Sequence, residues 1–118
     1  MRYFKKRGKF GAIRTNGFAS KLESAVHDIL KLKEHGGEIF EVVCQSPVEL
    51  TDANIRYKAD FRYTDKKTGE YVWVEAKGAE GDRWRLIKKL WPHYGPGRLE
   101  VWRGTYRYPK LIEVINGK

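Results

Sequence analysis

The feature that most constrains this sequence is a pair of strand-like segments joined by a short turn. Apolar and polar residues alternate over residues 55–63, and this period of two is typical of a half-buried β-strand. Residues 65–69, Asp-Lys-Lys-Thr-Gly, have the composition of a turn, and residues 71–77 follow as a second strand. The sequence therefore predicts an antiparallel hairpin against which the rest of the chain must pack.

Three polar residues of this hairpin are candidates for a chemical role. Asp60 occupies a polar position of the first strand, and Glu75 and Lys77, two residues apart, share one face of the second. Mg²⁺ prefers oxygen ligands and is commonly held by one or two carboxylates. Asp60 and Glu75 are thus candidate ligands, and Lys77, roughly 6–7 Å along the strand, can orient water or phosphate. The alternative is three ordinary polar residues on a solvated sheet face.

The segment before the hairpin predicts a helix followed by a strand. Ser20 and Glu23 form a capping-box pattern, an apolar stripe follows, and the glycines at 36–37 end the helix. On these residues alone, a capping role for Glu23 is favoured over a role as a ligand facing the hairpin. Residues 38–45 predict a strand that Pro47 closes. At its end, Gln45 either bonds a phosphate or metal-bound water or is satisfied by backbone.

The segment after the hairpin predicts a second helix and one or two more strands. Residues 82–90 have helical spacing, with a Trp/Ile stripe on one side, and Pro92 with the glycines that follow should stop the helix. Residues 99–102 predict a further strand, and residues 111–115 predict either another strand or a C-terminal extension. At 118 residues the chain is one domain. We therefore expect an α/β fold in which helices flank a central mixed sheet.

Charge favours nucleic acid as the partner. Lys and Arg number 24 against 15 Asp and Glu, which gives a formal net charge of +9. No apolar run approaches the ~18–20 residues that span a bilayer, and the N-terminus has no signal-peptide pattern. We expect a cytoplasmic protein of a bacterial, archaeal or phage-infected cell, without a membrane partner. Because Cys44 is the only cysteine, disulfides and Cys-based zinc sites within one chain are excluded, and a buried, inert thiol is expected.

Two basic segments are candidate DNA contacts. Residues 1–17 form a basic arm with interleaved aromatic residues, which can follow phosphates, fray in solvent or form a dimer contact. Basic residues of the second helix can line the phosphate path, although a solvated helix face is the default explanation. The predicted DNA-binding residues are Lys5, Lys6, Arg7, Lys9, Arg14, Lys88 and Lys89.

The order of these motifs resembles a known family. Asp60, fourteen intervening residues and then Glu75-Ala76-Lys77, after a helix that carries Glu23, resemble the PD-(D/E)XK nuclease signature. The match runs from residue 18 to about 102 and is most similar to archaeal-type Holliday junction resolvases and small phage endonucleases. Ala59 stands where the name-giving proline would be. The resemblance implies a restriction-endonuclease-like fold over residues 18–118.

It also implies roles for individual residues. Glu23 would join Asp60 and Glu75 around Mg²⁺, with Mn²⁺ as a substitute, and Lys77 would be the motif lysine. The implied protein is a homodimer that resolves four-way DNA junctions by paired nicks, in recombination and repair. Another phage or restriction-type DNA endonuclease is the nearest alternative, and a non-catalytic nucleic-acid-binding module is the alternative from a different class.

Overall fold

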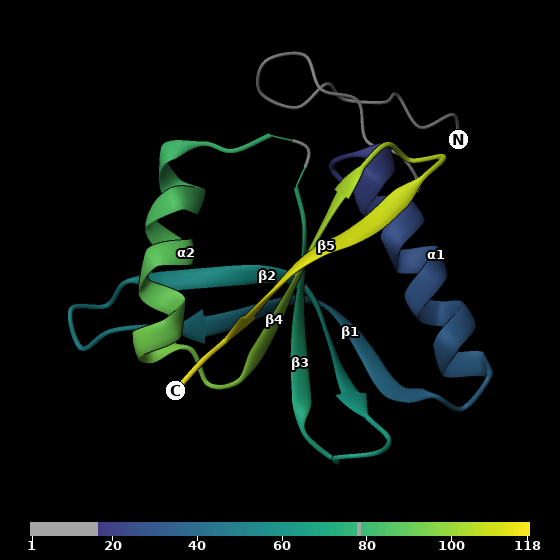
Figure 1. The fold of residues 1–118 in the computed structure, drawn as a ribbon, viewed down its shortest axis with the longest axis horizontal. Helices are drawn as coiled ribbons and strands as arrows, with labels where there is room; N and C mark the ends of the chain where they lie inside the picture. The colour runs from purple at the N-terminus through teal and green to yellow at the C-terminus, as the bar shows by residue number, and fades with distance from the viewer. Residues whose placement is uncertain (1–16, 78) are drawn as a thin grey trace, which may run out of the picture.

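A five-stranded mixed sheet with one helix on each side organises the chain (Figure 1). The computed structural model describes residues 17–77 and 79–118. The elements in chain order are α1 (Lys21–His35), β1 (Ile39–Glu49), β2 (Arg56–Asp65), β3 (Tyr71–Ala76), α2 (Asp82–Tyr94), β4 (Arg98–Gly104) and β5 (Pro109–Asn116). The predicted α/β class, the two helices and the first four strands are confirmed, and the C-terminal segment forms a fifth strand.

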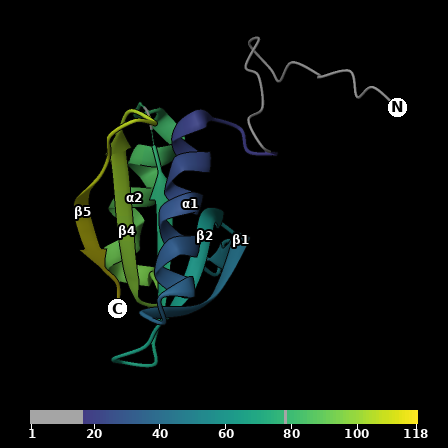
Figure 2. The same ribbon diagram turned by 90° about the vertical axis from the view of Figure 1, so that its right-hand side faces the viewer.

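The sheet combines an antiparallel meander with one parallel crossover. Its strand order is β1-β2-β3-β4-β5, so each strand lies beside its neighbours in the chain. β1, β2 and β3 pair antiparallel, whereas β3 and β4 pair parallel, with α2 as the crossover between them. β5 returns antiparallel to β4. The sheet is therefore mixed, and α2 covers it from the side opposite α1 (Figure 2).

Two apolar clusters hold the helices against the sheet. Leu22, Val26 and Leu30 of α1 pack against one side of β3, which contributes Val72 and Val74. The α2 cluster contains Trp84, Ile87 and Trp91 together with Trp73. Neighbouring residues of β3 thus serve opposite clusters, as the alternation of a strand requires. Because side chains alternate along β3, Glu75 lies on the same face as Trp73, which is the face that α2 covers.

The buried side chains of β2 divide between the same two clusters. Tyr57 and Ala59 pack in the α2 cluster, whereas Phe61 and Tyr63 pack in the α1 cluster. Alternation predicted correctly that all four are buried. It placed them on a single face, however, and the structure shows that they change cluster between Ala59 and Phe61. Asp60 lies at this change, and the Tyr57 side chain reaches the α2 side of the sheet as a result.

Two element ends differ from the prediction, both at prolines. β1 continues through Pro47, which pairs with Lys58, because β1 is an edge strand and an edge position tolerates a missing N–H. α2 likewise continues through Pro92 to Tyr94. Trp91 beside it is fully buried, and the packing of this indole outweighs the loss of one backbone hydrogen bond in the last helical turn.

Two further expectations concern the N-terminus and membranes. The predicted basic arm, with Lys5, Lys6, Arg7, Lys9 and Arg14, lies outside the described residues except for Gly17. Within the part of the chain that the structure describes, no helix is long and apolar enough to span a bilayer.

Candidate active site

Asp60 and Glu75 come together where the β2–β3 hairpin opens. The ladder between these strands ends at the pair Phe61 and Val74, so the next residues on each strand are Asp60 and Glu75. Beyond this pair the ladder is replaced by a side-chain contact, because Asp60 Oδ2 accepts a hydrogen bond from the backbone N–H of Ala76 at 2.8 Å. The hairpin therefore places two carboxylates side by side, as predicted.

Glu75 is held by a hydroxyl on one oxygen and faces an ammonium on the other. The Tyr57 hydroxyl donates to Glu75 Oε1 within the protein interior. Lys77 Nζ lies 3.8 Å from Glu75 Oε2, which confirms that Glu75 and Lys77 share one face of the second strand. Glu75 is only 6% exposed, whereas the Lys77 side chain is about one-third exposed. The lysine thus lies between a buried carboxylate and solvent.

Burial makes both carboxylates unusually weak acids. The pKa of Glu75 is raised to about 8, chiefly by burial and next by the Asp60 charge, while the Tyr57 hydrogen bond and Lys77 oppose the rise. The pKa of Asp60 is raised to about 6 by burial, against the Ala76 N–H and Lys77. Lys77 therefore offsets only part of the cost of ionising two neighbouring carboxylates at this position.

These residues line an open cavity of about 360 Å³ with a basic rim. Asp60, Glu75 and Lys77 lie in it together with Trp84 of α2. The basic residues that complete the lining are Arg56, Lys58 and Arg83. Positive charge around a carboxylate pair is suited to an anionic ligand that binds together with a cation.

The donor set at this cavity fits a divalent cation held by two carboxylates. Asp60 and Glu75 both line the cavity, and a cation there would relieve the repulsion that raises the pKa of Glu75. Mg²⁺ is commonly held by one or two carboxylates while waters and substrate phosphates complete its shell. Among residues 17–77 and 79–118, however, no three His, Cys, Asp or Glu side chains are grouped closely enough to hold a metal.

The structure does not bring Glu23 into this cavity. Glu23 lies on α1, 6% exposed, where its Oε2 accepts a hydrogen bond from Gln45 Nε2 at 3.3 Å. These two residues line a separate cavity of about 440 Å³. Glu23 still contributes to the raised pKa of Glu75, as the smallest of its causes. Glu23 thus influences the hairpin carboxylates through its charge but does not line their cavity.

The contacts of Glu23 distinguish its two predicted roles and identify the partner of Gln45. The Ser20 hydroxyl accepts a hydrogen bond from the Glu23 backbone N–H at 3.0 Å, which confirms the predicted N-cap. Capping by Ser20 uses the Glu23 backbone, so the Glu23 carboxylate is available to Gln45. Gln45 adopts a left-handed conformation with φ of 55°, and its amide donates to the Glu23 carboxylate, which is neither of the two partners expected for it.

Cys44 corrects an expectation. The sequence predicted a buried thiol, whereas Cys44 is exposed on β1 beside Gln45. Partial burial and the nearby Glu23 charge raise the pKa of the thiol.

The two lysines of α2 lie away from the carboxylate cavity. Lys88 Nζ is 3.1 Å from Glu80 and 3.2 Å from Glu113, so its charge links α2 to the segment before it and to β5. Lys89 is exposed and does not line the cavity. Arg83 and Lys58, which the sequence analysis did not single out, line it instead. Helical periodicity identified the solvated face of α2 without indicating which basic residue faces the hairpin.

Tyr57 is the other residue that sequence reasoning missed. The alternation of β2 marks it as one more buried apolar position, and it is 8% exposed. A buried tyrosine hydroxyl generally needs a hydrogen-bond partner, and this requirement was the available signal. Its ring packs against Trp84 and Trp91, with centroids 6.1 and 6.0 Å away. Two indoles therefore hold the ring whose hydroxyl binds Glu75.

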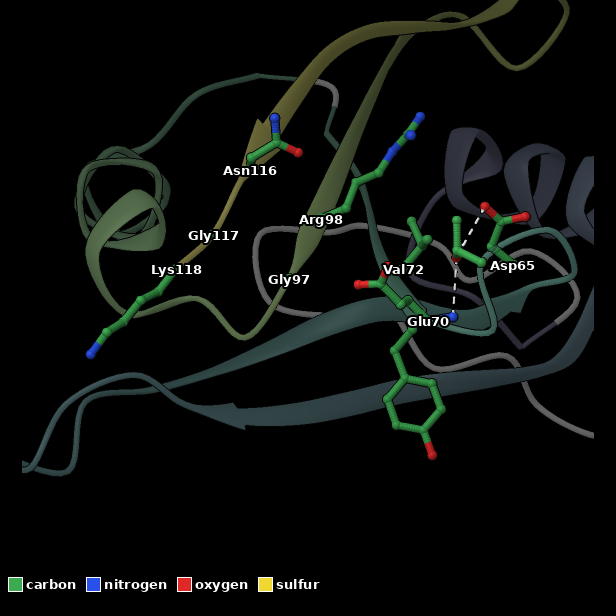
Figure 3. Close-up of a pocket in the computed structure, with 10 residues that line it drawn as sticks. Asp65, Glu70, Val72, Gly97, Arg98, Asn116, Gly117 and Lys118 are labelled. Carbon is green, nitrogen blue, oxygen red and sulfur yellow. Dashed lines mark hydrogen bonds between the residues drawn. The ribbon is translucent and has the colours of Figure 1, made fainter.

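A third cavity lies at the opposite end of β3 (Figure 3). It has a volume of about 300 Å³, and Asp65 and Arg98 are among its lining residues. The Asp65 carboxylate accepts hydrogen bonds from the Lys67 backbone N–H and the Thr68 hydroxyl, so it serves the hairpin turn. None of the predicted catalytic residues lines this cavity.

Comparisons of the chain with protein-family models, with curated proteins and with solved structures gave no match. The interpretation of the site consequently depends on its own geometry and chemistry.

Proposed function

We propose that this chain is a metal-dependent DNA endonuclease of the PD-(D/E)XK type with a restriction-endonuclease-like fold. The observation that carries the proposal is the cluster of Asp60, Glu75 and Lys77 in one cavity, with Lys77 Nζ 3.8 Å from Glu75 Oε2. Surface carboxylates and lysines paired by chance are common, but they are rarely buried. A buried Glu75 beside a half-buried Asp60, both with raised pKa values and both lining one cavity, is typical of a functional site.

Each residue has a defined task in this proposal. Asp60 and Glu75 would hold the divalent cation, Mg²⁺ or Mn²⁺, and the Ala76 N–H fixes the orientation of the Asp60 carboxylate. The bound cation supplies a Lewis acid that polarises a phosphoryl oxygen and lowers the pKa of a water. Lys77 orients the attacking water or offsets negative charge that grows on the phosphate. The Tyr57 hydroxyl occupies one oxygen of Glu75 and leaves the other toward Lys77.

The substrate we propose is branched DNA, with a four-way junction as the leading candidate. The +9 net charge and the basic rim of the cavity favour a polyanion. Symmetric paired nicks would need a homodimer, with two sites related by a two-fold axis. Another phage or restriction-type endonuclease would use the same carboxylates on other DNA. A binding module without catalysis is favoured by one observation, the lack of a third grouped ligand among the described residues.

The test is cleavage of a labelled immobile four-way junction beside duplex, single-stranded and flap DNA, with Mg²⁺ and with chelator. We expect metal-dependent paired nicks on the junction. Cutting spread over all four DNAs would retain the nuclease and discard the junction preference. Tight binding without cutting in any metal would replace the nuclease by the binding module.

Variants connect the outcome to the site. Asp60→Asn and Glu75→Gln should abolish cleavage and leave DNA binding intact, because each removes a carboxylate without changing the size of the side chain. Glu100→Gln is the matched control: Glu100 is 5% exposed but bonds Tyr63 and Trp102 on the α1 side of the sheet. This variant should still cut. An Asp60→Asn protein that cuts at the wild-type rate would refute the assignment.

A further inference from the structure

The loop between β4 and β5 presents two tyrosines to solvent. Tyr108 is 73% exposed and Tyr106 is 44% exposed, and neither ring belongs to the two core clusters. The loop is short, since β4 ends at Gly104 and β5 begins at Pro109. Two aromatic rings on one short loop provide a flat apolar surface that the fold itself does not use.

Hydrogen bonds and a close backbone approach fix the conformation of this loop. The Tyr108 backbone N–H donates to the Thr105 carbonyl at 3.0 Å and lies 3.2 Å from the Thr105 hydroxyl oxygen, which also accepts from it. Gly104 has φ of 96°, and a Cβ there would lie 2.5 Å from the Tyr108 carbonyl oxygen, so the close approach requires glycine. Because the turn is set in advance, a partner that binds Tyr108 has little backbone to order.

Positive charge surrounds the two rings. The segment 103–112 contains three basic residues and no acidic one. The Arg107 guanidinium lies 5.5 Å from the Tyr106 ring centroid, and Lys21 of α1 lies 5.0 Å from it. Within residues 17–77 and 79–118, no cation lies over the Tyr108 ring. Tyr106 therefore has two cations near its ring, whereas the Tyr108 ring is the more exposed of the two, at 73%, and can contact another flat group.

The loop lies at the same end of the sheet as Lys77. The Lys77 backbone N–H donates to the Trp102 carbonyl at 2.9 Å, and β4 reaches Gly104 only two residues later. Figure 1 and Figure 2 both show the β4–β5 loop at the end of the molecule where β3 leaves the sheet. A DNA strand that enters the carboxylate cavity can therefore continue toward this loop.

We propose that the β4–β5 loop binds unpaired nucleotides of a DNA strand, with Tyr108 stacking on a base and Arg107 and Lys110 contacting phosphates. An exposed aromatic ring stacks on any base and so gives affinity without sequence preference. Bases within a duplex are already stacked on one another, so the ring selects unpaired nucleotides. The inference rests on the proposed function in that both concern the same DNA, and it adds the structural feature of the substrate that this end of the protein recognises.

The test is a binding measurement in chelator, so that no DNA is cut. Fluorescence anisotropy is recorded for single-stranded DNA and for a duplex of equal length. Tyr108→Ala should weaken single-strand binding about tenfold and change duplex binding less than about twofold, whereas Tyr108→Phe keeps the ring and should bind like wild type. Arg107→Ala should weaken both and lower the salt dependence by about one phosphate contact. Tyr94→Ala is the control, since Tyr94 is 50% exposed at the end of α2.

The outcomes separate this inference from the nuclease proposal. Equal single-strand affinity of Tyr108→Ala and wild type, or equal losses on both DNAs, would overturn the stacking role. A monomer produced by Tyr108→Ala from a wild-type dimer, at unchanged DNA affinity, would identify a second copy as the occupant and overturn it as well. Single-strand binding lost in Tyr108→Ala by a chain that cuts no DNA would support the loop while refuting the nuclease.

Discussion

The raised pKa of Glu75 predicts an unusual dependence of stability on pH. In the folded chain this pKa rises from 4.5 to about 8 through burial and the Asp60 charge. Between these values the folded state binds more protons than the unfolded state, so the free energy of unfolding falls as pH increases. The stabilisation that comes from protonated Glu75 is fully present below its unfolded pKa of 4.5 and is lost as the pH rises through its folded pKa of about 8.

The structure sets the size of the effect. Each pKa unit corresponds to about 1.4 kcal/mol, so ionising Glu75 in the folded chain costs roughly 5 kcal/mol relative to the unfolded chain. Glu75→Gln removes this ionisation and keeps an oxygen that can accept from the Tyr57 hydroxyl. From about pH 4 to about pH 9, the variant should therefore gain several kcal/mol of stability relative to wild type.

Urea unfolding followed by tryptophan fluorescence over this pH range is the assay. The control is Glu49→Gln, an exposed carboxylate on β1 that pairs with Arg56; its stability should follow wild type at each pH. Parallel pH curves for wild type and Glu75→Gln would refute the reasoning, because they would mean that Glu75 ionises normally.

Adding Mg²⁺ tests the cation site in the same experiment without any cleavage. A cation that binds only the folded chain stabilises it by about 2.7 kcal/mol at a hundredfold excess over its dissociation constant. Above neutral pH, Mg²⁺ should raise the free energy of unfolding of wild type and leave Glu75→Gln unchanged. An equal rise in both proteins would place the cation elsewhere.

Two further pairs of substitutions test contacts of the site and the core. Tyr57→Phe and Tyr63→Phe each remove a buried hydroxyl that donates to a glutamate, and each should lower the free energy of unfolding by about 1 kcal/mol. Only Tyr57→Phe should move the acidic limb of the cleavage pH profile to higher pH, because the Tyr57 hydrogen bond lowers the pKa of Glu75. A matching shift in Tyr63→Phe would contradict this role. Gly95→Ala should destabilise by about 1–3 kcal/mol in urea unfolding, since the new Cβ would lie 2.5 Å from the Trp91 ring. Gly81→Ala meets nothing within 4 Å and should be near neutral; similar losses for the two would show that the core yields around Trp91.

The local pattern of the sequence determined most of the secondary structure. Alternation over residues 55–63 predicted β2, and the Asp65–Gly69 turn chemistry predicted its return as β3, because both signals act between residues close in the chain. Ser20 likewise predicted the start of α1. The errors at Pro47 and Pro92 occurred where tertiary context decides whether a missing N–H matters.

The site was only partly determined in this way. A spacing of two placed Glu75 and Lys77 on one face, and the hairpin placed Asp60 opposite them, which needs only strand geometry. Which third residue meets them was decided by the tertiary structure. The Glu23 carboxylate binds Gln45 in another cavity. Tyr57 binds Glu75 because the buried side chains of β2 change from one apolar cluster to the other. Period-two alternation carries no information about such a change, since it depends on how two helices pack on opposite sides of a twisted sheet.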